Sequence, residues 1–455
     1  GESLELALLA AATAGAAVAG LADVLTGGPR SYAVGGWAPP WGIEVVLDPL
    51  SGFTASVIAV VATLTLLAGA PSVRRGYGRD ASTYYALALL LVTGLQGMVV
   101  SGDLFNVFVF LEVASISSYA LVASGGGPAL AAAFRYLVLG TVGASFYLLG
   151  VGCLYALTGT LNMADLAARL PEAPASPLFA GGVAFLVIGL AIKMGLFPLH
   201  GWLPDAYTRA PAPVAALMAP IATKAAVYVL ARVLLYVLRP EGLPLGATLG
   251  WAGALAILAG GALAVTQTDA RRLLAYSSVS QIGYITLGLG LANESGLAGA
   301  YLHVLSHALM KAALFVAVAA AALDGRGPAL ASLRQGRRMP ITGACAVVAA
   351  LSMVGVPPAS GFFSKWYLLE GALAAGQPLL AGAVLAGSLL AAVYMYRLTE
   401  AVWFGEPGAA DGRPEAPAPL LIGLVLLTVA SLGFGLGNAA LVSGVLGPAA
   451  SGALR

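Results

Sequence analysis

Thirteen apolar stretches, most of them about as long as a bilayer-spanning helix, follow one another along this 455-residue chain. A helix needs about 20 apolar residues to cross the hydrocarbon core of a membrane, because each residue adds about 1.5 Å of length. The stretches cover residues 3–25, 48–70, 82–100, 103–123, 128–157, 178–200 (continuing brokenly to 217), 219–238, 248–267, 270–292, 295–323, 340–375 (broken), 378–404 and 418–446. We therefore expect an all-α polytopic membrane protein.

The composition excludes several other classes of protein. Hydrophobic residues make up 60% of the chain and charged residues 9%, whereas a soluble domain carries about 25% charged residues. No basic run with interleaved aromatic residues indicates a nucleic-acid partner. The two cysteines, Cys153 and Cys345, lie in different apolar stretches and cannot build a disulfide framework, a zinc site or an iron–sulfur site. We expect no cofactor and no metal, and lipid as the surroundings.

The arginines divide unevenly between the two sides of the membrane if consecutive stretches cross in alternate directions. One side carries Arg74, Arg75, Arg79, Arg209, Arg271, Arg272, Arg326, Arg334, Arg337, Arg338 and Arg413, and the other carries Arg30, Arg169 and Arg239. The positive-inside rule then makes the first side cytoplasmic and puts the C-terminus outside a prokaryotic cell (inner) membrane. The chain begins at Gly1 without a basic leader, so the first stretch is not predicted to be a signal peptide.

Two stretches are interrupted by proline and glycine at comparable places, around 193–213 and 354–365. Proline removes a backbone donor, and loose backbone at membrane depth is tolerated where it lines protein or a hydrated cavity. The spans from 82 onward form two groups of five, each with a broken fourth member. We predict N-terminal helices over 1–81, inverted five-helix repeats over 82–238 and 239–404, and a C-terminal helix over 405–455.

All four lysines of the chain and one glutamate lie inside apolar stretches. They are Lys193, Lys224, Lys311, Lys365 and Glu112. Each charge at bilayer depth costs about 2.5–3.5 kcal/mol on insertion scales, so such residues persist only when paired, hydrated or neutral. Intramembrane ionisable residues commonly mark a path for protons or ions. We therefore predict an ion-translocating protein.

Glu112 is surrounded in sequence by Phe105, Phe108, Phe110 and Leu111. A carboxyl group in such surroundings either binds a proton or finds a cation. The candidate cations are the lysines at 193 and 224, on the spans that flank the first break. A static ion pair that ties helices together is the alternative interpretation.

The segment 303–311, HVLSHALMK, places His303, His307 and Lys311 at every fourth position of a helix. Groups spaced about 6 Å apart on one face can relay protons with water between them. Two histidines at this spacing also fit a metal pair, but no third ligand lies nearby in sequence and Val304 rules out an HExxH motif. Simple packing histidines remain the other alternative.

Five further polar residues are candidates for the same path. Lys365 follows the second break and either ends the path or extends to the membrane interface. His200 lies at the first break and either extends the path or caps the broken helix. The accessory candidates Ser277, Gln281 and Tyr284 on the ninth span can order water, or serve only as interhelical hydrogen-bonding groups.

Five motifs in order give the chain a resemblance to a known family. They are GDLFNVFVFLEV, IKMGLFPLHGWLPDAYTRAPAPVAALMAPIATK, SSVSQIGYI, HVLSHALMKAALF and VGVPPASGFFSKW. Together they resemble the proton-translocating antiporter-like subunits of Mrp-type cation/proton antiporters, respiratory complex I and membrane-bound hydrogenases. The similarity covers nearly the whole chain. The residues around Glu112 and the length favour the D subunit of Mrp antiporters.

The resemblance implies fourteen transmembrane helices, inverted five-helix repeats and broken seventh and twelfth helices. It implies that Glu112 pairs with Lys193 and that Lys224 is the lysine of the eighth helix. It further implies a central relay of His303, His307 and Lys311, and an exit at Lys365. The family's first helix would precede Gly1, so it is expected either outside this sequence or missing from this member.

The main functional expectation is the proton-translocating subunit of a multisubunit Na+/H+ antiporter, with other membrane subunits, protons and a monovalent cation as partners. A pump subunit of a complex I-like NADH-quinone oxidoreductase or a hydrogenase is the first alternative. No glycine fingerprint for a dinucleotide occurs in a βαβ setting, so no redox chemistry of its own is expected. A stand-alone permease of inverted-repeat design is the second alternative.

Overall fold

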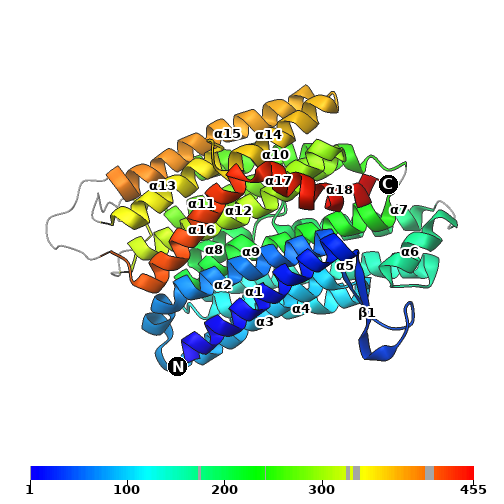
Figure 1. Cartoon of the computed structure of the whole chain (residues 1–455), viewed down its shortest axis with the longest axis horizontal. Coiled ribbons are helices and arrows are strands. Elements are labelled where there is room, and N and C mark those ends of the chain that lie inside the picture. Colours follow the sequence, from blue (N-terminus) through cyan, green and yellow to red (C-terminus); the bar gives the residue numbers. More distant parts are fainter. Residues whose placement is uncertain are drawn as a thin grey trace.

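The computed structural model describes residues 2–172, 176–240, 242–323, 328–330, 339–404 and 415–454. These residues form a bundle of helices, with a small β-hairpin at one end. The N-terminus and the C-terminus of the chain lie at opposite ends of the bundle (Figure 1). The first half contains α1 (Glu2–Gly27), β1 (Arg30–Ala33), η1 (Val34–Gly36), β2 (Glu44–Leu47), α2 (Pro49–Tyr77), η2 (Gly78–Asp80), α3 (Ala81–Val100), α4 (Leu104–Ala123), α5 (Pro128–Thr158), α6 (Met163–Arg169), η3 (Leu170–Glu172), α7 (Pro177–Met194), α8 (Leu203–Arg209), α9 (Ala212–Ala231) and η4 (Arg232–Leu238). The second half contains α10 (Leu245–Val265), α11 (Ala270–Leu291), α12 (Glu294–Ala321), α13 (Pro340–Val354), α14 (Ser360–Ala374), α15 (Pro378–Thr399), η7 (Glu400–Phe404), α16 (Ala418–Leu436), α17 (Asn438–Leu441), η8 (Val442–Leu446) and α18 (Gly447–Leu454).

Ten helical stretches among the described residues are long and apolar enough to cross a membrane. One of them, Pro49–Val100, is 52 residues long and contains both α2 and α3. Two predicted crossings are not among these ten stretches. Helix α11 carries many polar side chains, and the crossing formed by α13 and α14 is interrupted between the two helices. Counting α2 and α3 separately and adding both segments gives the thirteen predicted crossings. The all-α polytopic prediction is confirmed.

The bundle has two distinct ends. At the hairpin face, β1 pairs antiparallel with β2, and bridges Val45 to Ser101 and Asp103 to Asn162 tie the hairpin and the neighbouring loops together. The opposite end, the arginine-rich face, carries the loop that follows α2 and the start of α9; there Tyr77 is hydrogen bonded to Ser124 at 2.6 Å. Five arginines predicted for this face lie outside the described residues, namely Arg326, Arg334, Arg337, Arg338 and Arg413.

Both predicted breaks are present and share one local geometry. Helix α7 is capped by Gly195 and α13 by Gly355, the residues that follow their last turns, with φ of 70° and 94°. Glycine adopts these left-handed angles without the steric penalty of a side chain. In each break the residue after the glycine donates its N–H to a carbonyl five residues earlier, at Ala191 and at Leu351. The helical backbone is thus interrupted inside the bundle twice.

Helices in equivalent positions of the two groups of five make equivalent contacts. Helix α3 packs on α4, α4 on α5 and α5 on α7, while α10 packs on α11, α11 on α12, and α12 on both α13 and α14. The most apolar window of α12 is wholly buried, and α12 also contacts α2, α9 and α16. This helix therefore forms the centre of the bundle. The division of the chain into two repeats stays a prediction.

Candidate functional site

The predicted ionisable residues come from five helices and lie inside the bundle. Glu112 is on α4, Lys193 on α7, Lys224 on α9, the 303–311 triad on α12 and Lys365 on α14. Lys224, His303, His307 and Lys311 are fully buried, and Lys365 is 5% exposed. Burial of cations in an apolar bundle is costly unless each finds partners. The contacts of each group therefore decide what the site can do.

Glu112 and Lys193 form an ion pair at one end of the predicted proton path. The Lys193 ammonium lies 3.5 Å from the Glu112 carboxylate and donates hydrogen bonds to the hydroxyls of Ser115 at 2.8 Å and Tyr119 at 3.5 Å. These acceptors follow Glu112 by three and seven positions on α4, so they share its helix face. Of the two candidate cations in the sequence, Lys193 is the one that pairs with Glu112.

Glu112 is also reachable from the side of the bundle. Its side chain is 29% exposed and lines a groove of about 550 Å³ between α4 and α5, with Ile116, Leu130 and Phe134 among the walls. The carboxylate oxygen that faces Lys193 is itself buried and has no hydrogen-bond partner among the described residues. On the other side of the pair, a cavity of about 30 Å³ lies between Lys193 and α9. That volume holds about one or two water molecules.

Lys224 has no ion pair among the described residues. Its ammonium donates to the carbonyl of Ala219 at 3.0 Å and to the hydroxyl of Thr223 at 3.3 Å, both on its own helix. Helix α9 packs on α7 and on α12, so Lys224 lies on the helix between the Glu112 pair and the α12 triad.

The three residues on α12 do share one face. The rings of His303 and His307 are stacked with centroids 6.2 Å apart. His303 is hydrogen bonded through its two ring nitrogens to Ser364 at 2.8 Å and Gln281 at 2.9 Å. The Lys311 ammonium donates to Ser277 and to the carbonyl of Leu274.

His307 differs from its neighbours because neither ring nitrogen has a hydrogen-bond partner in the described part of the chain. Buried polar atoms of native proteins are almost always satisfied by protein or by ordered water. We therefore infer that water serves His307. Both nitrogens of His303 are already engaged, and no third histidine, cysteine, aspartate or glutamate joins the pair within the described ranges. The described residues therefore offer no complete set of metal ligands around the two histidines.

Lys365 lies at the second break and is buried there. Its ammonium donates to the carbonyls of Met353 at 2.8 Å and Val354 at 3.1 Å, the last residues of α13. It also lies 4.6 Å from the centre of the Tyr284 ring, which is 5.3 Å from the His303 ring. These contacts and the burial of Lys365 speak against the alternative that it extends to the membrane interface. The broken helix supplies free carbonyls that hold the cation inside.

The accessory candidates divide into two groups. Ser277, Gln281 and Tyr284 contact the lysines and histidines directly, as described above. His200 does not: its ring stacks on Phe197 at 5.3 Å and one of its nitrogens has no partner among the described residues. The His200 ring also makes an edge contact with the ring of Tyr276, the residue before Ser277, with centroids 6.2 Å apart.

Three partners were missed by the sequence analysis. Ser115 and Tyr119 share a helix face with Glu112, so helical spacing could have found them. Ser364 immediately precedes Lys365 in sequence, but its hydrogen bond to His303 joins α14 to α12. No sequence spacing indicates that contact.

Comparison with known proteins identifies the family. A family model described as "NADH:quinone oxidoreductase/Mrp antiporter, TM" matches residues 101–391, a range that contains every residue of the predicted path. This chain belongs to that family. The antiporter-like subunit is thus a multi-pass membrane protein of the kind that Mrp antiporters and complex I share.

Individual relatives come from three kinds of complex. The N subunit of NADH-quinone oxidoreductase of Desulforudis audaxviator (strain MP104C) is 45% identical over 458 residues, which covers 97% of this chain and 91% of the relative. The D subunit of the Na(+)/H(+) antiporter of Bacillus subtilis (strain 168) is 31% identical over 436 residues, with 94% and 88% covered. A chain of the membrane-bound sulfane sulfur reductase, an archaeal respiratory membrane complex, matches with a TM-score of 0.92 at 32% identity, covering 100% of this chain and 92% of that one.

These relatives bear on the expected host complex. The sequence analysis favoured the D subunit of Mrp antiporters, but the identity to an N subunit is higher. The preference for the Mrp type is therefore not confirmed, whereas the antiporter-like family is. The relatives are subunits of multisubunit membrane complexes, which supports other membrane subunits as partners.

Proposed function

We propose that the antiporter-like subunit moves protons across the membrane along the series of ionisable side chains from Glu112 to Lys365. The observation that supports the proposal is that the four lysines and the two α12 histidines lie inside the bundle and that Glu112, itself partly exposed, pairs with Lys193. Each lysine has oxygen acceptors around it, and the α12 histidines lie between Lys311 and Lys365. A lysine can release its proton and an arginine cannot, so an all-lysine interior suits reversible transfer.

The proposed path has two halves. The first contains Glu112, Lys193 and Lys224, and the second contains Lys365. Lys311, His307 and His303 join them along α12. The Glu112 carboxylate stabilises the Lys193 ammonium while they stay paired; when they separate, the ammonium loses its counter-charge and passes its proton toward Lys224. A proton entering at one end thereby shifts charge at the other.

The proposed orientation puts the arginine-rich face in the cytoplasm and the hairpin face outside. The support is the positive-inside rule applied to short loops. Accessibility of single cysteines introduced in the loops at Arg79 and at Arg169 to a membrane-impermeant thiol reagent tests the orientation. Labelling of the Arg79 site from outside intact cells would contradict it.

The proposed host is a multisubunit cation/proton antiporter, in which proton flow through this subunit drives export of Na+ or another monovalent cation. The alternative host is a complex I-like NADH-quinone oxidoreductase, where redox reactions in other subunits drive the protons. The 31% identity to a D subunit of an Na(+)/H(+) antiporter supports the first host and the 45% identity to an N subunit supports the second. The proposed proton path is common to both.

Vesicles that contain the whole native complex test the function and the host. Proton movement is followed with a pH-sensitive dye after a pulse of Na+ or of NADH. We expect one of the two to drive proton movement and Glu112→Gln and Lys193→Met to abolish it while the complex still assembles. Unchanged proton movement in both variants would refute the proposed function. Activity of the isolated chain alone would favour a stand-alone permease.

A further inference from the structure

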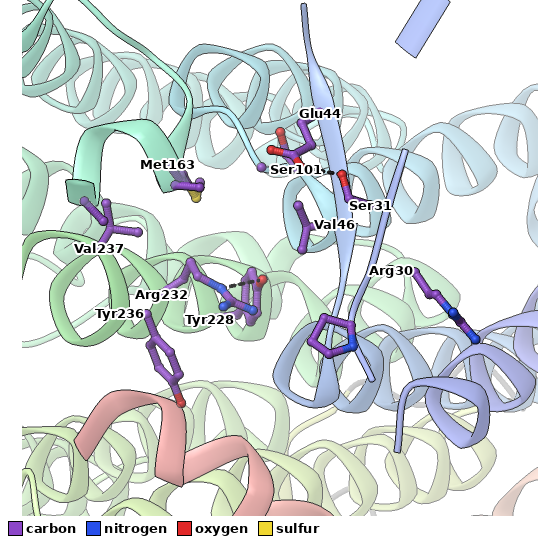
Figure 2. Close-up of a pocket in the computed structure, with 14 residues that line it drawn as sticks. Arg30, Ser31, Glu44, Val46, Ser101, Met163, Tyr228, Arg232, Tyr236 and Val237 are labelled. Carbon is purple, nitrogen blue, oxygen red and sulfur yellow. Dashed lines mark hydrogen bonds between the residues drawn. The ribbon is translucent and has the colours of Figure 1, made fainter. Parts of the chain in front are cut away.

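Three charged side chains line a pocket of about 290 Å³ on the hairpin face, and each of them has a partner (Figure 2). The contacts are Arg232 with Asp48, Arg30 with Asp23, and Glu44 with both Ser31 and Asn162. Each contact is a single arrangement of donor and acceptor. The hydrogen bonds around His303 differ in this respect, because one hydroxyl there has a choice of acceptors.

His303 lies in a continuous line of hydrogen bonds that joins four helices. The line runs from the Gly361 carbonyl on α14 through Ser364, His303 on α12 and Gln281 on α11 to Tyr394 on α15. All four side chains of the line are fully buried. Tyr394 has no part in the proposed proton path, although its hydroxyl is one step from His303.

The side-chain amide of Gln281 presents different atoms to its two neighbours. Its oxygen lies 2.9 Å from Nε2 of His303, and its nitrogen lies 3.4 Å from the Tyr394 hydroxyl. An amide oxygen accepts hydrogen bonds and has no proton to donate. Nε2 of His303 therefore carries a proton in this contact. When the ring is neutral it holds one proton only, so Nδ1 is then bare.

Ser364 has two possible acceptors for its one hydroxyl proton. Its Oγ atom lies 2.8 Å from Nδ1 of His303 and 3.0 Å from the Gly361 carbonyl oxygen. When Nδ1 is bare, the hydroxyl donates to it. When Nδ1 carries a proton, the ring donates to Oγ and the hydroxyl turns to the Gly361 carbonyl. Rotation about one bond thus satisfies both charge states of His303.

We infer that Gln281, oriented by Tyr394, is a positioning residue that holds neutral His303 in its Nε2–H tautomer, so that His303 takes up and returns protons at Nδ1, beside Ser364. An amide does not titrate in the physiological range, so Gln281 cannot receive the Nε2 proton. The ring is therefore closed to proton transfer toward α15 and open toward α14, where Lys365 follows Ser364. The exchange of protons at Nδ1 rests on the proposed function, whereas the tautomer does not.

The opposite orientation of the Gln281 amide makes a different prediction. The amide nitrogen would then donate to Nε2, and the single proton of the neutral ring would lie on Nδ1. A second proton could bind to Nε2 only after the amide had turned round. The position of the proton on neutral His303 therefore distinguishes the two arrangements.

The measurement of the tautomer is nitrogen-15 NMR of the full chain in lipid vesicles, with label in the rings of its three histidines. Protonated and bare ring nitrogens resonate in separate ranges, and the His303 signals are those that disappear in His303→Gln. We expect a protonated Nε2 and a bare Nδ1 in the neutral ring. Tyr394→Phe frees the amide to turn and should raise the ratio of Nδ1–H to Nε2–H tautomer about fivefold, the Boltzmann factor of one ordinary hydrogen bond. Tyr396→Phe, at an exposed position of the same helix, should keep the wild-type ratio.

The role of Nδ1 is tested by proton uptake into vesicles that contain the whole complex. Ser364→Ala leaves Gln281 in place, so the Nε2–H tautomer should remain, but Nδ1 loses the hydroxyl beside it. Uptake should fall by about fivefold or more, the factor of one lost hydrogen bond. Ser306→Ala is the matched control, because the Ser306 hydroxyl donates to the Leu302 carbonyl of its own helix. It should transport as the wild type does.

Three outcomes would overturn the inference: a neutral wild-type His303 with its proton on Nδ1, a folded Tyr394→Phe with an unchanged ratio, or equal uptake by Ser364→Ala and Ser306→Ala. If Tyr394→Phe does not fold, Gln281→Met takes its place. Methionine has a similar length and gives Nε2 no amide oxygen, so the ratio should rise there as well.

Transport by Glu112→Gln is measured on the same vesicles and separates this inference from the proposed function. Loss of transport in Glu112→Gln with an Nδ1–H tautomer in the wild type would reject the role of Gln281 alone. Normal transport by Glu112→Gln with the expected spectra would reject the proposed function and uphold the tautomer.

Discussion

The Lys193 ammonium lies closer to the Ser115 hydroxyl, at 2.8 Å, than to the Glu112 carboxylate, at 3.5 Å. A short contact to the neutral hydroxyl and a longer one to the anion describe a lysine that can stay solvated when the ion pair opens. This geometry fits a reversible pair better than a rigid one, since rigid charge-assisted bonds are about 2.7–2.9 Å long.

Glu112→Gln should reduce proton transport at least about tenfold, because the amide keeps the shape of the side chain but loses the charge that holds the Lys193 proton. Proton uptake by vesicles measures the loss. Glu370→Gln on the exposed surface of α14 is the matched control and should transport normally. Equal transport by both variants would remove Glu112 from the path.

Lys311→Arg should assemble and fail to transport. The guanidinium retains the positive charge and can still donate to Ser277 and the Leu274 carbonyl, but it does not release its proton. Proton uptake by vesicles is compared with that of Ser277→Ala, which removes one acceptor of Lys311 and should cost less. Full activity of Lys311→Arg would show that this position supplies charge only.

His307→Leu should block transport without lowering stability, because the imidazole has no hydrogen-bond partner in the described structure to lose. Leucine would also exclude the water that we infer beside the ring. His307→Gln keeps polar atoms for that water and should retain more activity. Thermal unfolding in detergent and proton uptake are measured together. A strongly destabilised His307→Leu variant would indicate a structural histidine instead.

Gly253→Ala should destabilise the contact of α10 with α11 by about 1–3 kcal/mol, the usual cost of overpacking. A methyl group there would lie 2.5 Å from the Leu287 nitrogen and 2.6 Å from the Gly283 carbonyl oxygen, and backbone atoms cannot move aside. Gly382→Ala on α15 meets no atom within 4 Å and is the control. A lower melting temperature in detergent is expected for Gly253→Ala only.

Acid should weaken the contact of Asp48 with Arg232. Burial by itself would raise the pKa of Asp48, but the charge and hydrogen bond of Arg232 and the bonds from Ser51 outweigh it and hold the pKa below its ordinary value. A carboxyl whose pKa is lowered by folding stabilises the fold above its unfolded pKa and stops doing so as the pH falls through its folded pKa. The melting temperature of Asp48→Asn should therefore fall less than that of the wild type below about pH 4. Parallel acid profiles would contradict this.

Several features of the site were predictable from local sequence. The prolines and glycines around 195 and 355 predicted both breaks, because proline cannot complete a helical hydrogen bond and glycine alone adopts the cap conformation freely. The four-residue spacing of His303, His307 and Lys311 predicted one shared face, since 3.6 residues make a helical turn. These predictions need only neighbours along the chain.

Other features depended on contacts between helices. Glu112 had two candidate cations by sequence, and only the packing of α4 against its neighbours selects Lys193. Lys365 could equally have reached the membrane surface, and only the position of the α13 carbonyls holds it inside. The pocket beside Arg232 gathers residues from the hairpin, α6 and η4, a combination that no spacing along the chain indicates.

The sequence by itself determined that this protein crosses the membrane many times and keeps its lysines within the apolar spans, because the lengths of apolar runs and the cost of burying charge are properties of single segments. The tertiary structure decided which of those charges meet, which histidine nitrogens lack a partner among the described residues, and that Arg232 on η4 pairs with Asp48 before α2. Such pairings depend on how helices far apart in sequence rotate and pack against one another, and the helical period of one segment does not specify the face presented by another.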